Sequence, residues 1–340
     1  MRATFDRQQI PETPSPLPTP TQPPTVPHHL AGRILDTAIA CLVDNPTRKF
    51  TYVEIAYFER WWQIQNDAMK ATVRQLVQNG QLEFNLGGWC MNDEATPLYS
   101  QEVDQMTEGA QFLLRELGAR PTVGWHVDPF GHSAATPSMW AQMGLDGFGL
   151  NRIDYRLKNE LMQTKGLEFV WRSSASMGTE TDMWIHIMPF HYCTPGECGY
   201  DGGLIINTDA LLPTYGVNVQ QQAQDFLAMS RGRMQLMLHD KVLIPFGCDF
   251  AHQNAYRSFV QMDQLIAYIN ANPALNARVQ YATFSDYVAA VHSANVTWPL
   301  RTPEMGDFFP YADHPSQCGV RRCHVDHRTT CRVAVHGVLA

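Results

Sequence analysis

Residues 122–133 read Thr-Val-Gly-Trp-His-Val-Asp-Pro-Phe-Gly-His-Ser. A short apolar run ends at Asp128, and Pro129 and Gly131 behind it are typical turn residues. This pattern predicts a strand that delivers a carboxylate at its exit. Similar apolar runs recur along the chain and alternate with segments that have helical spacing of apolar residues. The alternation predicts an α/β fold with a parallel sheet, either open or closed into a barrel.

The predicted elements follow one another from about Gly32 onward. Strands are predicted at 50–58, 81–86, 122–127, 168–172, 183–188, 241–246 and 278–282. Helices are predicted at 60–79, 100–118, 217–233, 256–271 and 284–293. In a parallel sheet or barrel the loops at the carboxyl ends of the strands meet on one face, so we expect the functional side chains there.

Two flanking segments differ from this central part in composition. Residues 1–31 are rich in proline, with eight prolines in the first thirty residues, and we expect them to be disordered. Residues 318–340 are basic, rich in cysteine and histidine and without periodicity, so we expect them to lie outside the domain. The predicted domain therefore covers residues 32–317.

Composition and charge exclude several classes of partner. The formal net charge of −8 and the absence of a basic stripe argue against nucleic acid. No stretch of 18 apolar residues is present and the N-terminus has no apolar signal region, which predicts a cytosolic chain as written, without a membrane span. Two features favour a secretory route instead: the glycosylation sequon that begins at Asn295, and Cys193 and Cys198, which could close a short disulfide loop.

Asp128 and Asp249 are the candidate catalytic residues, because each follows a predicted strand on the same face. A retaining glycoside hydrolase uses two carboxyl groups, one as the nucleophile and the other as the general acid and base. The alternative for Asp128 alone is a helix or turn cap. His126 is interpreted as a packed histidine rather than a metal ligand, and Phe130 as an aromatic platform for a sugar ring.

Two further groups of residues are candidates for binding a sugar or a metal. Trp61 and Trp62 could bind a sugar ring, but helix and core packing is the preferred interpretation. The residues 323–327, CHVDH, have zinc-ligand spacing but no hairpin or helix around them.

Five ordered strings carry a resemblance to glycoside hydrolase family 38, above all to its lysosomal acid α-mannosidases. They are RKFTYVEIAYFERWW (48–62), GGWCMNDEA (87–95), WHVDPFGHS (125–133), AQMGLDGF (141–148) and DFFPYAD (307–313). The resemblance implies a zinc-dependent enzyme that removes terminal α-mannosides from oligosaccharides with retention, in a lysosomal or secretory compartment. It also implies a parallel seven-stranded β/α barrel.

By position, the resemblance assigns roles to individual residues. Asp128 matches the nucleophile, which is also a zinc ligand, and Asp249 matches the acid and base. Phe130, Arg152 and Tyr192 match residues that contact the substrate. Oligomeric state cannot be predicted from these strings.

The chain departs from the family pattern at the metal. The family's His-x-His-x-Asp segment on the first barrel strand is missing, and so is a later histidine ligand, which leaves Asp128 as the one recognisable ligand. We therefore expect an incomplete barrel that lacks its first strand, and a chain that is inactive because zinc ligands are missing. The alternatives are a non-catalytic mannose-binding remnant and, more remotely, a metal-dependent polysaccharide deacetylase.

Overall fold

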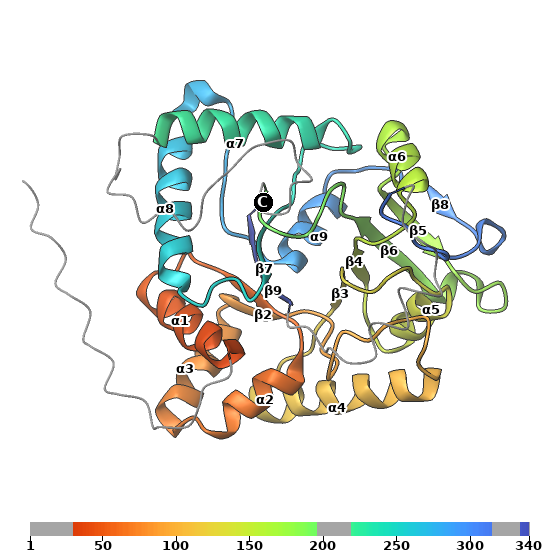
Figure 1. The fold of residues 1–340 in the computed structure, drawn as a ribbon, viewed down its shortest axis with the longest axis horizontal. Coiled ribbons are helices and arrows are strands. Elements are labelled where there is room, and N and C mark those ends of the chain that lie inside the picture. The colour runs from red at the N-terminus through yellow and green to blue at the C-terminus, as the bar shows by residue number, and fades with distance from the viewer. Residues whose placement is uncertain (1–29, 196–218, 315–333, 340) are drawn as a thin grey trace, which may run out of the picture.

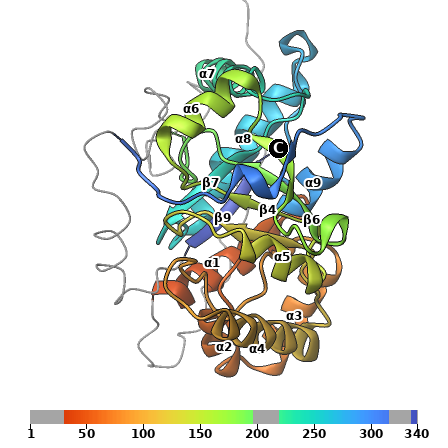
Figure 2. The same ribbon diagram turned by 90° about the vertical axis from the view of Figure 1, so that its right-hand side faces the viewer.

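The computed structural model describes residues 30–195, 219–314 and 334–339. Strands lie in the middle of the molecule and helices surround them (Figure 1). After a turn of 90°, helices α2, α3 and α4 lie on one side of the strands and α6 and α7 on the other (Figure 2). Within the described residues, no helix combines the length and the apolar character that crossing a membrane requires.

Helices and strands alternate along much of the chain as the sequence predicts, although helices α1, α5 and α6 were not predicted. The α-helices are α1 (Leu30–Asp44), α2 (Ile55–Gln63), α3 (Asp67–Gln78), α4 (Tyr99–Leu117), α5 (Ala135–Gln142), α6 (Tyr155–Thr164), α7 (Val219–Met234), α8 (Ala255–Ala271) and α9 (Phe284–His292). The strands are β1 (Phe50–Tyr52), β2 (Leu82–Phe84), β3 (Val123–His126), β4 (Gly147–Leu150), β5 (Glu168–Arg172), β6 (Asp182–Ile187), β7 (Ile244–Asp249), β8 (Leu300–Arg301) and β9 (Ala334–Leu339). Short 3₁₀ helices are η1 (Gly178–Thr181), η2 (Pro273–Leu275) and η3 (Pro303–Met305).

The described strands form two sheets, and a closed seven-stranded barrel is not found. The sheet orders are β2-β1-β9-β7 and β3-β4-β6-β5-β8. The pairs β1–β2, β3–β4, β4–β6 and β5–β8 are parallel, whereas β5 runs antiparallel to β6. A closed barrel requires each strand to pair with two neighbours, and here β2, β3, β7 and β8 are edges. One backbone hydrogen bond, from the Leu86 N–H to the Val123 carbonyl at 2.8 Å, links the loop after β2 to β3.

The edge that was expected to be open carries a strand from the C-terminal segment. Strand β9 lies between β7 and β1 and runs antiparallel to both. It therefore supplies backbone hydrogen-bond partners to β7 and β1, whose edges would otherwise be unpaired. Residues 334–339 thus belong to the same sheet as β1, although their composition differs from that of the domain.

Local packing explains where the predicted boundaries are wrong. The predicted strand 50–58 ends at Tyr52, because helix α2 begins at Ile55 and buries Phe58, Trp61 and Trp62 on one face. The predicted helix 60–79 is two helices, and the Asn66 side chain caps the second by accepting from the Met69 N–H at 2.9 Å.

Two other segments differ from the prediction for local reasons. Residues 278–282 form no strand, because the Asn270 side chain takes both backbone hydrogen bonds of Val279. Strand β4 was not predicted, since it has four residues and two are glycines. A Cβ on Gly147 would lie 2.8 Å from the Trp184 carbonyl oxygen, so glycine allows the close approach of β6.

Candidate active site

The carboxyl ends of β3 and β4 bring Asp128 and Arg152 together. The two strands are parallel and His126 pairs with Leu150, so the residues two positions further on lie side by side. Arg152 Nη2 donates to Asp128 Oδ1 at 2.7 Å. Tyr192, in the segment after β6, donates its hydroxyl to the same oxygen at 2.8 Å. Three of the predicted site residues therefore meet at one carboxylate.

Arg152 is fixed by contacts on several sides. Its guanidinium carbon lies 4.5 Å from the Phe130 ring centroid, a cation–π distance. Its Nη1 donates to the Tyr311 hydroxyl at 3.4 Å and lies 3.8 Å from Asp313 Oδ2. The Gly131 N–H donates to the Arg152 carbonyl at 3.1 Å, which ties the turn after β3 to the loop after β4. Residues 307–313, quoted above as a matching string, thus contribute two contacts that the sequence did not assign.

Burial and neighbouring charges shift the pKa values of several groups around this site. Burial lowers the pKa of His191 to about 4, and the charges of Arg152 and Lys158 act in the same direction. Burial alone would lower the pKa of Arg152, but Tyr192 and Asp128 hold it above its usual value. A guanidinium this close to Asp128 favours the ionised carboxylate, which is the form that can act as a nucleophile.

A disulfide brings Asp249 to the same region. Asp249 is the last residue of β7, Cys248 precedes it, and Cys248 is bonded to Cys193, the residue after Tyr192. Backbone contacts reinforce the link, since the Thr194 N–H donates to the Gly247 carbonyl at 2.8 Å and Gly247 N–H donates to Thr194 Oγ1 at 2.9 Å. Burial raises the pKa of the Tyr192 phenol, and the negative charge of Asp249 raises it further. The sequence suggested a disulfide between Cys193 and Cys198. That prediction is wrong, because Cys193 is bonded to Cys248. Cys198 lies outside the described residues.

Removing the disulfide should destabilise the chain. The bond closes a loop with a sequence separation of 55, for which loop-closure entropy predicts a loss of about 4 kcal/mol in the free energy of unfolding. Urea unfolding of the Cys193→Ser/Cys248→Ser double variant measures this loss against the unchanged chain. Peptide mapping that joined Cys193 to Cys198 would contradict the assignment.

A buried carboxylate holds both ends of the turn that carries Asp128. Glu94 Oε1 accepts from His126 Nδ1 at 2.6 Å and from His132 Nδ1 at 2.7 Å, with each ring in the tautomer that carries a proton on Nδ1. Glu94 Oε2 accepts from the Ser133 N–H at 2.7 Å. Glu94, His126 and His132 have no exposed side-chain surface. His126 precedes Asp128 and His132 follows it, so one side chain sets the geometry of the whole turn.

Glu94, His126 and His132 also form a group whose ligand atoms could gather around a metal ion. Their present spacing is that of hydrogen bonds. Ligands on a tetrahedral ion with bonds of about 2.0 Å are separated by about 3.3 Å, so an ion would require both histidines to move away from Glu94. We therefore interpret the group as a hydrogen-bonded clamp, in agreement with the predicted packed role of His126. No local pattern indicates this clamp, because Glu94 lies 32 residues before His126.

Glu94→Gln tests the clamp. The amide NH₂ would have to face one of three N–H donors, so we expect a loss of about 3 kcal/mol in the free energy of unfolding. Chemical denaturation measures it, and the exposed Glu160→Gln on α6 is the matched control. Equal stability of the two variants would show that the clamp does not constrain the turn.

Glu102, on α4, is a second buried carboxyl beside this clamp, and it is 4% exposed. Burial raises its pKa to about 7, and the charge of Glu94 adds to the effect, while the neighbouring Thr136 and Trp140 act in the opposite direction. The folded chain therefore retains a proton on Glu102 that the unfolded chain has already lost above pH 4.5.

The stability that Glu102 contributes should be lost as the pH rises from about 4.5 to 7, because over that window this carboxyl holds its proton in the folded state and not in the unfolded state. A shift of this size corresponds to about 3 kcal/mol. We expect Glu102→Gln to remove this part of the pH dependence, whereas Glu108→Gln, exposed on the same helix, should keep it. Unfolding free energies at several pH values provide the measurement, and identical slopes for all three proteins would contradict the raised pKa.

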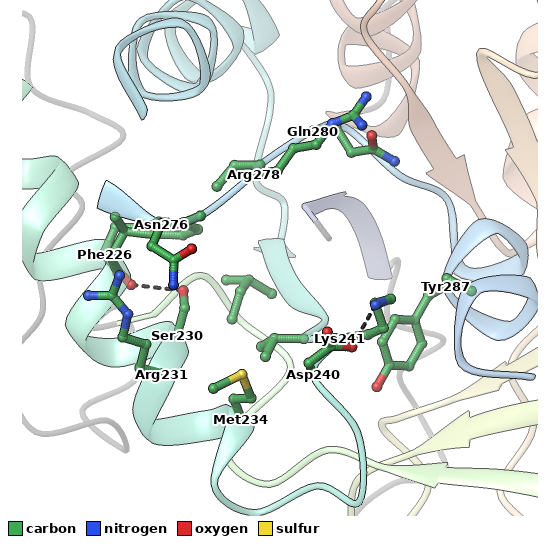
Figure 3. Close-up of a pocket in the computed structure, with 16 residues that line it drawn as sticks. Phe226, Ser230, Arg231, Met234, Asp240, Lys241, Asn276, Arg278, Gln280 and Tyr287 are labelled. Carbon is green, nitrogen blue, oxygen red and sulfur yellow. Dashed lines mark hydrogen bonds and ion pairs between the residues drawn. The ribbon is translucent and has the colours of Figure 1, made fainter. Parts of the chain in front are cut away.

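A cavity of ≈ 730 Å³ lies elsewhere, between α7, the start of β7, residues 276–280 and α9 (Figure 3). Phe226 and Met234 supply apolar walls, and Arg231, Lys241 and Arg278 lie around it. Ile244, which lines it, is at the opposite end of β7 from Asp249. None of the predicted site residues borders this cavity.

Three further predictions concern the two tryptophans of α2, the segment 323–327 and the metal role of Asp128. Trp61 and Trp62 are 3% exposed and pack in the core, which confirms the preferred interpretation. The residues 323–327 lie outside the described part of the chain. Within the described part, Asp128 belongs to no group of three metal-ligand side chains.

The comparisons with known proteins agree with this geometry. Residues 18–314 match the glycosyl hydrolases family 38 N-terminal domain. The chain is 44% identical over 282 residues to a lysosomal alpha-mannosidase of Dictyostelium discoideum, covering 82% of this chain and 27% of that protein. It is 40% identical over 292 residues to the human lysosomal alpha-mannosidase, covering 84% of this chain and 28% of that protein. The crystal structure of an alpha-mannosidase from Enterococcus faecalis shares the fold, with a TM-score of 0.59 at 16% identity over 82% of this chain and 28% of that one.

The matching family model and the curated relatives define the class of the chain as a glycoside hydrolase. The chain belongs to glycosyl hydrolase family 38. It spans little more than a quarter of the length of the two curated relatives named above.

Proposed function

We propose that this chain is the catalytic domain of an α-mannosidase, with residues 32–317 and strand β9 as the domain and terminal α-mannosides of oligosaccharides as its substrates. The observation that carries the proposal is the carboxylate of Asp128, held by Arg152 and Tyr192 and joined through the Cys193–Cys248 bond to the loop of Asp249. The names of the relatives support the sugar. The comparisons favour neither a mannose-binding remnant nor a polysaccharide deacetylase.

The proposed reaction is a double displacement with retention. Asp128 attacks C1 of the mannoside while the Asp249 carboxyl gives its proton to the departing oxygen, which leaves a covalent glycosyl ester on Asp128. Asp249, now a carboxylate, takes a proton from water, and that water attacks C1 and releases Asp128. Tyr192 and Arg152 keep Asp128 ionised before attack, and Phe130, half-buried beside Arg152, faces the sugar.

The family implies zinc at the nucleophile, where it would polarise the sugar hydroxyls. The described residues around Asp128 do not fit that ion, since they provide a guanidinium and phenols where two further ligands are needed. We therefore propose that this chain alone hydrolyses mannosides slowly or not at all.

A lysosomal or secretory location is part of the proposal. The chain has a disulfide, which forms in oxidising compartments. Asn295 of the glycosylation sequon is exposed after α9. The proton on Glu102 would stabilise the fold in an acidic compartment. The lysosomal names of the relatives agree with this location.

An aryl α-mannoside assay tests the function. We expect turnover near the detection limit, unaffected by added zinc, together with measurable binding of methyl α-mannoside. Any residual turnover should disappear in Asp128→Asn, because an amide cannot form the glycosyl ester. Arg156→Met, an exposed residue on α6, is the control. Rapid zinc-dependent hydrolysis would contradict the proposed inactivity, and hydrolysis that persisted in Asp128→Asn would contradict the nucleophile.

A further inference from the structure

The turn after β7 carries an exposed aromatic side chain directly behind Asp249. Strand β7 ends at Asp249, and Phe250 is the next residue, with 43% of its surface exposed. Its backbone has a φ of 58°, in the left-handed region that is strained for a bulky L-residue. A ring that packed in the core would be buried, so core packing does not account for this conformation. An exposed ring in a strained turn beside a proposed catalytic carboxyl indicates a contact with a ligand.

Contacts with neighbouring segments hold this turn in place. Gln253 Nε2 donates to the Phe250 carbonyl at 3.1 Å. His252 also has a positive φ, of 61°, and its buried ring donates from Nε2 to the Phe246 carbonyl at 2.9 Å. The Thr37 hydroxyl, on α1, donates to the His252 carbonyl at 3.0 Å. Phe250 is therefore presented by a rigid turn rather than by a loose loop.

The position of Phe250 in the chain relates it to the leaving group. A general acid lies within hydrogen-bond distance of the oxygen that it protonates. In the proposed reaction Asp249 protonates the glycosidic oxygen, which joins the mannose to the next sugar of the oligosaccharide. Consecutive Cα atoms are about 3.8 Å apart, so the residue after Asp249 is within reach of that next sugar. Phe130 is placed differently, because it follows Asp128 and lies against Arg152.

A phenyl ring is well suited to bind a sugar at this place. One face of a pyranose ring presents C–H groups, which pack against the flat face of an aromatic ring and remove apolar surface from water. The ring of Phe250 turns about only two side-chain bonds, so little conformational entropy is lost when a sugar covers it. Such packing is independent of charge and therefore tolerates the acidic and basic groups of the site nearby.

We infer that Phe250 is the binding platform for the sugar on the leaving-group side of the scissile bond, so that this chain recognises an α-mannosyl disaccharide unit better than a single mannoside. The inference rests on the proposed function and extends it to the second sugar. Phe130 faces the mannose that is transferred to Asp128, and Phe250 faces the sugar that departs.

Saturation-transfer NMR titrations of the whole chain with methyl α-mannoside and with the methyl glycoside of α-linked mannobiose test the inference. We expect the unchanged chain to bind the disaccharide about fivefold or more tightly, because one more sugar face packs on an aromatic ring. Phe250→Gly should lower this ratio of affinities to about one and leave the affinity for methyl α-mannoside unchanged. Phe250→Tyr keeps the ring and should keep the preference. Tyr99→Ala, which removes a ring that is 74% exposed on α4, is the control and should also keep it.

Urea unfolding of the same variants distinguishes ligand binding from packing. Glycine adopts the left-handed region without strain, so Phe250→Gly should be at least as stable as the unchanged chain if the ring serves a ligand. A packing role predicts the opposite result, a lower unfolding midpoint together with weaker binding of both sugars.

The outcomes separate the inference from the function on which it rests. If the unchanged chain binds neither sugar, the proposed function is wrong and the inference fails with it. Equal affinity for the two sugars, or a preference that persists in Phe250→Gly, would overturn the inference and leave the mannoside function standing. A Phe250→Gly chain that is less stable and binds both sugars weakly would show that the ring serves packing, which also overturns the inference.

Discussion

The clamp on Glu94 is the constraint on which the geometry of the site depends. Three N–H groups, from His126, His132 and Ser133, end on one buried carboxylate, and the turn with Asp128 and Phe130 lies between them. A buried ionised group is stable only when its hydrogen bonds are complete. The need to satisfy Glu94 therefore fixes the strand exit, and the strand exit fixes where Asp128 meets Arg152.

The sheets supply the second level of positioning. Parallel pairing of β3, β4 and β6 aligns their carboxyl ends, which places Asp128, Arg152 and the segment with Tyr192 at one edge. Asp249 belongs to the other sheet, so sheet pairing alone does not place it there. The bond between Cys193 and Cys248 provides the link between the two sheets at the site.

Local patterns predicted much of the fold, and long-range contacts decided the rest. Strand β5 was predicted with the bounds found, because its apolar and β-branched residues have no competing helical pattern. The run after Tyr52 was misread because its aromatic residues suit a strand and a buried helix equally well. Closure of the barrel could not be judged from the sequence, since it depends on pairing between strands that are far apart, and β9 comes from a segment without periodicity.

The same distinction between local patterns and long-range contacts applies to the site. Asp128 and Asp249 could be proposed as site residues because strand exits have a recognisable sequence, whereas the partner of Cys193 could not be predicted, because nothing local indicates a bond over 55 residues. A covalent bridge of that span also keeps the chain in one piece after damage. A single proteolytic cut between Thr194 and Gly247 would leave both cleavage products joined at the sulfur atoms, with Tyr192 on one and Asp249 on the other. Such a nicked molecule would migrate as an intact chain until it is reduced.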